Sequence, residues 1–447
     1  MAANGFRESL AVIGGGITGI AAALELAKSG KYRVTLFEKE NRLGGLNSPY
    51  EWQDVSCDRF YHIILPSDKK TIRFIKDLGL ESQLVWKPSK SGFFGEGKLV
   101  PFSSARDYLR FPFLSLREKF RLGLGIIYCT RFKSHRKLDK LLAPHWLKRI
   151  FGQNVYTKIW DSLLRSKLGD AKDRTSASFI WATIKRLYGS GSLLRNRGKM
   201  GYVRGGYFVV LRAAQKRLLE LGVKIMTDTA VIYLERKKNG KQKIVLRTPN
   251  GEFEFARALL TIPCPEIVKV VQGQGRHPYW RPLRNIEYLG VTSVLMVLKR
   301  PLSPYYVINL LDQSLPFTGV IETTNVLSPD DFGGKRLVYL PKYLTQDDPF
   351  NKLSDDRIKE SFILALKSIF PNFSQHDVLH QEVFRESYVQ PLHGLNFPKH
   401  KIGFRTPLSG LYTANSSQNY KSPNNNHAEI SLAREVVKVI REDSQRN

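Results

Sequence analysis

Three glycines near the N-terminus have the spacing of a phosphate-binding turn. Gly14, Gly16 and Gly19 follow an apolar run at residues 10–13 and open a helix-forming run that ends at Gly30. Gly14 permits a tight turn, Gly16 lets a pyrophosphate approach backbone amides, and Gly19 allows close packing of helix on strand. The phosphates would lie at the positive end of that helix. A preceding strand and a following helix favour a dinucleotide site over a purely structural turn.

A carboxylate follows at the distance that a ribose ligand requires. Residues 33–38 have the pattern of a second buried strand, which ends at Glu38, about 20 residues after Gly19. A carboxylate here accepts hydrogen bonds from ribose hydroxyls and repels a 2′-phosphate, so NADP is disfavoured. The sequence contains one such fingerprint, and we therefore expect no separate NAD(P)H domain.

The overall charge is strongly positive. Lys and Arg number 70 against 40 Asp and Glu, a net charge of +30. Such a field favours phosphate-bearing substrates, acidic membrane surfaces or nucleic acid, and a basic but inert surface is the alternative. Nucleic acid is disfavoured because no recognition motif accompanies the charge. The three cysteines have no paired spacing, so neither disulfides nor a zinc site is predicted, and no other metal site is expected. This use of cysteine is consistent with a reducing compartment.

The strands and helices expected to surround the glycine turn come partly from the second half of the chain. Residues 201–206 are glycine-rich and precede a helix, residues 410–415 have the pattern of a strand, and residues 428–442 form a closing helix. Pieces of one Rossmann-like unit are thus separated by long intervening blocks. The segment 10–27 is apolar, but its three consecutive glycines and Glu25 disfavour a membrane-spanning helix.

The residues after Glu38 resemble a known flavoprotein superfamily. Glu38-Lys39-Glu40-Asn41-Arg42-Leu43-Gly44-Gly45 is similar to the Arg-x-Gly-Gly element of the amine oxidase, protoporphyrinogen oxidase and phytoene desaturase superfamily. The resemblance implies FAD, with Arg42 approaching the pyrophosphate and with Gly44 and Gly45 letting the chain pass beside the flavin.

Other segments extend the resemblance over most of the chain. Residues 205–206 and 222–231 resemble the second FAD segment, 261–263 the entry to the substrate domain, and 410–415 the strand that leads to the flavin. The turn at 422–427 departs from the pattern because it is rich in asparagine. The FAD-binding residues implied are Gly14, Gly15, Gly16, Ile17, Thr18, Gly19, Glu38, Lys39, Arg42, Gly44, Gly45, Leu46, Val231 and Asn415.

The expected architecture is α/β with two discontinuous domains. A Rossmann-type FAD-binding domain, glutathione-reductase-like and of amine oxidase type, is expected from residues 1–85, 196–275 and 404–447. An α+β substrate domain of mixed sheet plus helical lobe is expected from residues 86–195 and 276–403.

Flavin enzymes need little catalysis from side chains, so no catalytic triad is expected. His62 is a candidate base or flavin contact, with a structural histidine as the alternative. Glu322, beside two threonines and an asparagine, is a candidate for a buried polar cluster. Further aromatic or polar candidates in the substrate domain, which also suit its core, are Trp160, Tyr305, Tyr306, Tyr388 and Gln390.

The segment 104–150 combines regularly spaced apolar residues with twelve Lys or Arg against three Asp or Glu. Basic amphipathic helices of this kind suit an anionic bilayer surface, as in relatives acting on porphyrinogens and carotenoids. The alternative is a helical cap whose apolar face packs inward. We expect a cytoplasmic protein, either free or peripheral at the inner face of the membrane.

The expected function is FAD-dependent oxidation or desaturation of a small or lipid-like substrate by two-electron transfer to flavin N5. The electron acceptor would be oxygen, a quinone or another molecule. Two alternatives stay open: a redox-neutral flavoprotein, such as a sugar-nucleotide mutase or carotenoid isomerase, and a non-catalytic FAD-binding protein.

Overall fold

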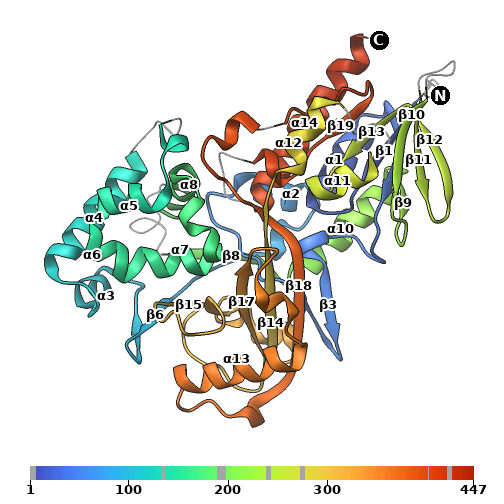
Figure 1. Cartoon of the computed structure of the whole chain (residues 1–447). Coiled ribbons are helices and arrows are strands. Elements are labelled where there is room, and N and C mark those ends of the chain that lie inside the picture. Colours follow the sequence, from blue (N-terminus) through green and yellow to red (C-terminus); the bar gives the residue numbers. More distant parts are fainter. Residues whose placement is uncertain are drawn as a thin grey trace.

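The computed structural model describes residues 7–131, 137–188, 198–237, 243–271, 277–400, 402–419 and 425–446. Three assemblies are visible in Figure 1: a parallel sheet with its helices, a mixed sheet with α13 (Asp355–Ile369) beneath it, and a separate helical lobe. The predicted α/β fold with a mixed-sheet substrate region is confirmed.

The parallel sheet has five strands in the order β19-β13-β1-β2-β9. They are β1 (Glu8–Ile13), β2 (Tyr32–Phe37), β9 (Lys224–Met226), β13 (Arg257–Leu260) and β19 (Leu411–Thr413). All five lie in the three stretches expected to build the flavin domain. Side chains of β1 alternate between two cores: Leu10 and Val12 enter one, and Ala11 and Ile13 enter the other. Burial on both faces explains why residues 10–13 of this strand are all apolar.

Different elements cover the two faces of the parallel sheet. One face carries four helices: α1 (Ile17–Lys28), α2 (Lys69–Asp77), α10 (Tyr207–Glu220) and α14 (Asn426–Arg446). The other face carries β10 (Tyr233–Lys237), β11 (Lys243–Thr248), β12 (Gly251–Phe255), α11 (Cys264–Val270) and α12 (Arg281–Arg284). The alanine-rich sequence of α1 favours a helix and lets α14 pack closely against it.

The mixed sheet has seven strands in the order β18-β14-β17-β16-β15-β6-β7. They are β6 (Ser91–Gly95), β7 (Lys98–Pro101), β14 (Tyr288–Leu298), β15 (Val307–Leu310), β16 (Gly319–Glu322), β17 (Arg336–Leu344) and β18 (Val378–Pro391). In β14, Val294 and Met296 pack toward α13, whereas Val291 and Leu295 face the opposite side. That opposite face meets two antiparallel strand pairs: the hairpin of β3 (Pro49–Trp52) with β4 (Val55–Asp58), and the long-range pair of β5 (Leu84–Pro88) with β8 (Lys199–Val203).

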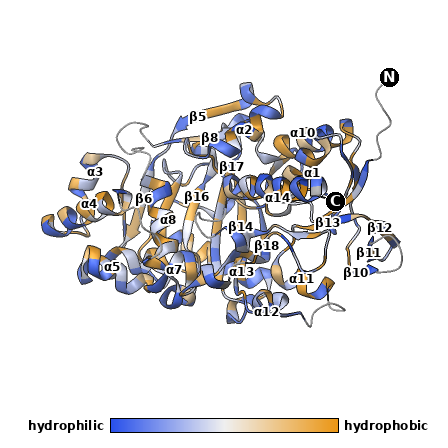
Figure 2. Ribbon diagram, turned by 90° about the horizontal axis from the view of Figure 1, so that it is seen from above, coloured by the Kyte–Doolittle hydropathy of each residue, from blue (hydrophilic) through white to orange (hydrophobic). Residues whose placement is uncertain are grey.

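The helical lobe forms one end of the molecule (Figure 2). Its helices are α3 (Ala105–Arg110), α4 (Leu116–Arg131), α5 (Ala143–Phe151), α6 (Gln153–Val155), α7 (Asp161–Leu168) and α8 (Ala177–Tyr188). A capping box between Ser104 and Asp107 begins α3. Among the described helices, none has the length and apolar character needed to cross a membrane.

Candidate active site

A cavity of about 830 Å³ lies where the carboxyl ends of the parallel strands meet the mixed sheet. Gly14 and Glu38 line one end of it, and Tyr343 and Gln390 line the other. Ligands of open parallel sheets bind at this edge because the strand ends and helix N-termini converge there. We call the glycine-turn end the flavin end and the mixed-sheet end the substrate chamber.

The glycine turn has the geometry that the sequence predicted. Gly14 has φ +109°, a conformation that side chains disfavour. A Cβ on Gly19 would lie 1.9 Å from the carbonyl oxygen of Gly14, so the helix can approach the strand only with glycine there. Gly16 caps α1, and a Cβ built on it meets no atom within 4 Å. The turn therefore leaves open space in front of the N-terminus of α1.

Glu38 is buried behind this turn. Its Oε2 accepts a hydrogen bond from the backbone N–H of Gly15 at 2.7 Å, and its Oε1 accepts one from Glu40 at 3.0 Å. The carboxylate thus fixes the turn as well as lining the flavin end. Lys39, also a predicted contact, lines the same end.

The Arg-x-Gly-Gly loop packs directly on the glycine turn. The N–H of Gly44 donates to the carbonyl of Gly15 at 2.9 Å, and a Cβ on Gly45 would lie 3.3 Å from the Cα of Gly16. Leu46 lines the cavity. Arg42 is exposed, donates to the carbonyl of Pro49 at 3.4 Å, and is absent from the cavity lining.

The strand β19 delivers Asn415 to the cavity. Its Oδ1 accepts from the N–H of Ser417 at 3.0 Å, whereas its buried Nδ2 has no partner among the described residues. Asn426, at the start of α14, exchanges two amide hydrogen bonds with Asn47 at 3.1 and 2.8 Å. Part of the asparagine-rich turn, residues 422–424, lies outside the described residues.

Sequence reasoning missed a carboxylate at this end. Glu429, in the first turn of α14, accepts a hydrogen bond from the Thr18 hydroxyl of α1 and another from Asn419 at 2.7 Å. Burial raises the pKa of Glu429 to about 7. Because Thr18 and Glu429 are 411 positions apart, no local pattern joins them. The sequence offered only a weak signal: Thr18 and Glu429 are polar residues in the first turns of two helices.

The flavin end fits FAD. A buried carboxylate stands behind the turn, and open space lies before a helix N-terminus, where phosphates bind favourably. Val231 lines the cavity as expected, and the free Nδ2 of Asn415 offers a donor. Gly14, Gly16, Glu38, Val231 and the loop after Glu38 would hold the cofactor.

Aromatic side chains dominate the substrate chamber. The hydroxyls of Tyr61 and Tyr343 are 3.3 Å apart, and both residues line the cavity. His62 also lines it; burial lowers the pKa of His62 to about 4, and its Nδ1 has no partner among the described residues. Tyr388 and Gln390, two of the sequence candidates, belong to the same lining.

The structure does not bring Glu322 to the cavity. Its Oε2 accepts hydrogen bonds from the N–H groups of Leu302 and Ser303, both at 3.2 Å, because β16 ends beneath that loop. Burial raises the pKa of Glu322 to about 7. The other candidates that lie outside the lining are Trp160, Tyr305 and Tyr306.

Comparison with known proteins identifies the family. The model of the family "Flavin containing amine oxidoreductase" matches residues 17–422, and the chain belongs to this family. It is therefore a member of a family of flavin-dependent oxidoreductases, and membership of this family implies FAD as the cofactor.

Individual relatives are distant. The chain is 22% identical over 265 residues to AofH of Mycobacterium tuberculosis, provisionally named a flavin-containing monoamine oxidase, covering 56% of each chain. It is 28% identical over 206 residues to mitochondrial protoporphyrinogen oxidase of Nicotiana tabacum, covering 43% of this chain and 40% of that one. The aligned part thus spans about half the length of these relatives.

The fold is shared over nearly the whole chain. Cyclohexylamine oxidase from Brevibacterium oxydans superposes with a TM-score of 0.72 at 14% identity, covering 98% of this chain and 100% of that one. Identity this low shows the fold alone.

Proposed function

We propose that this oxidoreductase oxidises or desaturates a small or lipid-like substrate in the chamber above the mixed sheet. The observation that carries the proposal is that residues of the Glu38 end and of the chamber line one and the same cavity. FAD, when bound, supplies the two-electron chemistry. An external acceptor, such as oxygen or a quinone, would complete the cycle.

The chain's own residues bind and orient the substrate. Val291 and Pro341 contribute apolar surface to the lining of the chamber. Tyr61 and Tyr343, whose hydroxyls are in contact, contribute aromatic side chains to the same lining. These side chains exclude water and limit the orientations open to a substrate. Because burial lowers the pKa of His62 to about 4, its imidazole is neutral at pH 7, and its Nδ1 can accept a hydrogen bond from a substrate or donate one to a substrate oxygen, according to the tautomer.

Anaerobic spectroscopy distinguishes this proposal from the two alternatives. We expect the purified protein to be yellow and to bleach when a reducing substrate is added without oxygen. A mutase or isomerase would convert its substrate with no net change in flavin oxidation state. A non-catalytic protein would show no bleaching with any candidate in a panel of amines, porphyrinogens and carotenoid precursors, and that outcome would contradict the proposal.

The helical lobe supports a second part of the proposal, peripheral docking on an anionic bilayer. The structure buries Phe111 and Leu122, but Leu116 and Phe120 of α4 are 76% and 70% exposed. The exposed apolar residues of α3 and α4, which are interspersed with exposed arginines, are Leu109, Leu116, Phe120, Leu124, Ile127 and Tyr128. Anionic lipid complements both features because it offers apolar depth and negative charge.

Vesicle sedimentation tests this docking. We expect the protein to sediment with phosphatidylglycerol vesicles and to bind phosphatidylcholine vesicles only weakly. Leu116→Ser combined with Phe120→Ser should weaken binding by roughly tenfold or more, because both side chains lose apolar burial. Leu364→Ser is the matched control, since Leu364 of α13 is 66% exposed but lies outside the lobe. Equal binding by the double variant and wild type would contradict membrane docking.

A further inference from the structure

Most charged groups that line the cavity already have partners. Asp68 pairs with Arg186 at 2.9 Å, and Glu266 pairs with Lys269 at 2.9 Å. Glu38 and Glu429 are held by the hydrogen bonds described above. Glu386, at the edge of the chamber, accepts hydrogen bonds from the backbone N–H groups of the two residues that follow it.

Two cations in the lining differ from the rest. Arg59 and Lys167 have no carboxylate within 4.0 Å among the described residues. The Arg59 guanidinium lies 5.5 Å from the ring centroid of Phe384, and the Lys167 ammonium lies 5.0 Å from that of Tyr343. Apart from a long hydrogen bond from Arg59 Nη1 to the Ser48 hydroxyl at 3.4 Å, the structure records no hydrogen bond from either head group to a described residue, so most of their donors are available to a ligand.

The aromatic rings that these two cations contact belong to the strands on either side of β14. Phe384 belongs to β18 and Tyr343 to β17, and both strands pair with β14. Phe384 is opposite Ser293 and Tyr343 is opposite Val291, so two strand spacings and a two-residue offset place their Cα atoms about 12 Å apart. Between them, β14 presents Val291 and Ser293 to the chamber.

Ser293 provides an independent indication of a ligand. It is 1% exposed, lines the cavity, and its Oγ has no hydrogen-bond partner among the described residues. Burying a hydroxyl without a hydrogen-bond partner costs free energy. A ligand oxygen that accepts a hydrogen bond from this hydroxyl would remove that cost.

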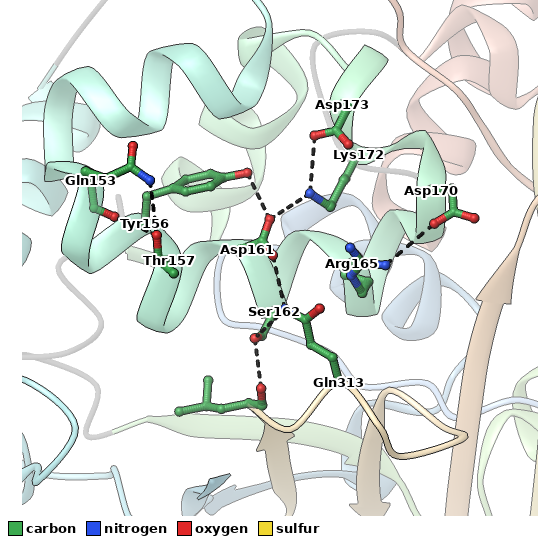
Figure 3. Close-up of polar contacts among 11 residues, drawn as sticks. Gln153, Tyr156, Thr157, Asp161, Ser162, Arg165, Asp170, Lys172, Asp173 and Gln313 are labelled. Carbon is green, nitrogen blue, oxygen red and sulfur yellow. Dashed lines mark hydrogen bonds and ion pairs between the residues drawn. The ribbon is translucent and has the colours of Figure 1, made fainter. Parts of the chain in front are cut away.

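The position of Lys167 is fixed by the rest of α7. Asp161, in the first turn, accepts hydrogen bonds from Tyr156, Lys172 and Gln313 at 3.0, 2.7 and 3.0 Å (Figure 3). The Ser162 hydroxyl donates to the carbonyl of Leu311 at 3.0 Å. These contacts tie α7 to the loop after β15, so the helix that carries Lys167 is held in place before any substrate arrives.

We propose that the substrate carries an oxyanion, a carboxylate or a phosphate, that binds in the chamber between Arg59 and Lys167 and accepts a hydrogen bond from Ser293. This inference rests on the proposed function, since it names the class of substrate for the same chamber. Charge-assisted hydrogen bonds to an oxyanion would satisfy donors that the chain leaves free. A protonated amine in the same position would be repelled by both cations.

Four ligands with one phenyl ring and different head groups test the assignment on the FAD-loaded protein. Benzoate, phenyl phosphate, benzylamine and benzyl alcohol are titrated while the visible flavin spectrum is recorded. We expect an anion to bind at least tenfold more tightly than benzyl alcohol, and benzylamine to bind more weakly still. Comparison of benzoate with phenyl phosphate decides between carboxylate and phosphate.

Substitution then locates the site. Lys167→Met and Arg59→Met should each weaken anion binding at least tenfold and leave binding of benzyl alcohol unchanged. Lys148→Met is the matched control, because Lys148 lies 4.8 Å from the ring centroid of Tyr156 but lies outside the cavity lining. The flavin content of each variant is measured first.

The outcomes separate the two proposals. Tighter binding of benzylamine, equal binding of all four ligands, no spectral response to either anion, or unchanged anion affinity in both chamber variants would overturn the oxyanion site. None of these results would affect the assignment of the chamber as the place of oxidation. A protein that binds FAD but never bleaches with any substrate would instead contradict the proposed function itself.

Discussion

The two ends of the cavity are built in different ways. At the flavin end, a buried carboxylate accepts hydrogen bonds from backbone N–H groups, and glycines set the shape of the turn. In the substrate chamber, side chains from distant segments meet, and His62 Nδ1 and Ser293 Oγ lack partners among the described residues. The carboxylate and the turn of the first end are held by the chain's own hydrogen bonds, whereas we propose that a ligand completes the polar contacts of the second. The substitutions below test whether the two ends differ in this way.

Reversing the charge behind the glycine turn should have the largest effect. We expect Glu38→Arg to lose FAD, with affinity reduced at least a hundredfold, because it removes the ribose acceptor and the support of Gly15. The measurement is the ratio of flavin absorbance to protein absorbance after purification. Glu51→Arg, at an exposed position of β3, should keep its flavin. Full yellow colour in Glu38→Arg would contradict the role given to Glu38.

Two glycines only three positions apart should respond differently. Gly16→Ala should lose FAD affinity while the apoprotein keeps its stability, because the new Cβ enters open space and the φ of −71° suits alanine. Gly19→Ala should lower the free energy of unfolding of the apoprotein by about 1–3 kcal/mol or more, because its Cβ meets the Gly14 carbonyl. Thermal unfolding of apoproteins and FAD titration separate the two effects. Similar behaviour of the two variants would show that the turn is not organised as described.

A smaller, pH-dependent effect is expected at Glu429. Its pKa is raised to about 7, so the folded apoprotein binds a proton that the unfolded chain releases near its ordinary pKa of 4.5. Stability from this group is therefore present at pH 4.5 and lost as the pH rises through 7. The melting temperature of Glu429→Gln relative to wild type should increase between pH 5 and pH 8. A constant difference across that range would be inconsistent with a buried acid.

The smallest effect on activity is expected for Glu322→Gln. Because Glu322 caps a loop outside the cavity, we expect turnover within twofold of wild type. Its pKa is also raised to about 7, so the glutamine variant should gain stability over wild type as the pH rises from 5 to 8. A large loss of turnover with unchanged flavin content would return Glu322 to the list of catalytic candidates.

The same contrast explains which features the sequence predicted. The turn at Gly14–Gly19 and the carboxylate of Glu38 lie within one βαβ unit, where spacing along the chain determines geometry. Lys167 and Ser293 have no local pattern, because their proximity depends on how a helical lobe meets a sheet. Glu322 is buried and hydrogen-bonded, as its polar neighbours in sequence suggested, but the sequence could not show that its strand ends outside the cavity. In segment 104–150 some apolar residues are buried and others are exposed. Periodicity alone could not show which residues belong to which group.

Cofactor analysis of the purified protein tests the central claim most directly. The protein is purified without added flavin, its visible spectrum is recorded, and the released cofactor is identified by mass. We expect one FAD per chain, or stoichiometric uptake of FAD by the apoprotein with loss of that uptake in Gly16→Ala. A colourless protein that binds no added FAD, or one whose FAD is unaffected by Gly16→Ala, would contradict a cofactor site at the mouth of α1.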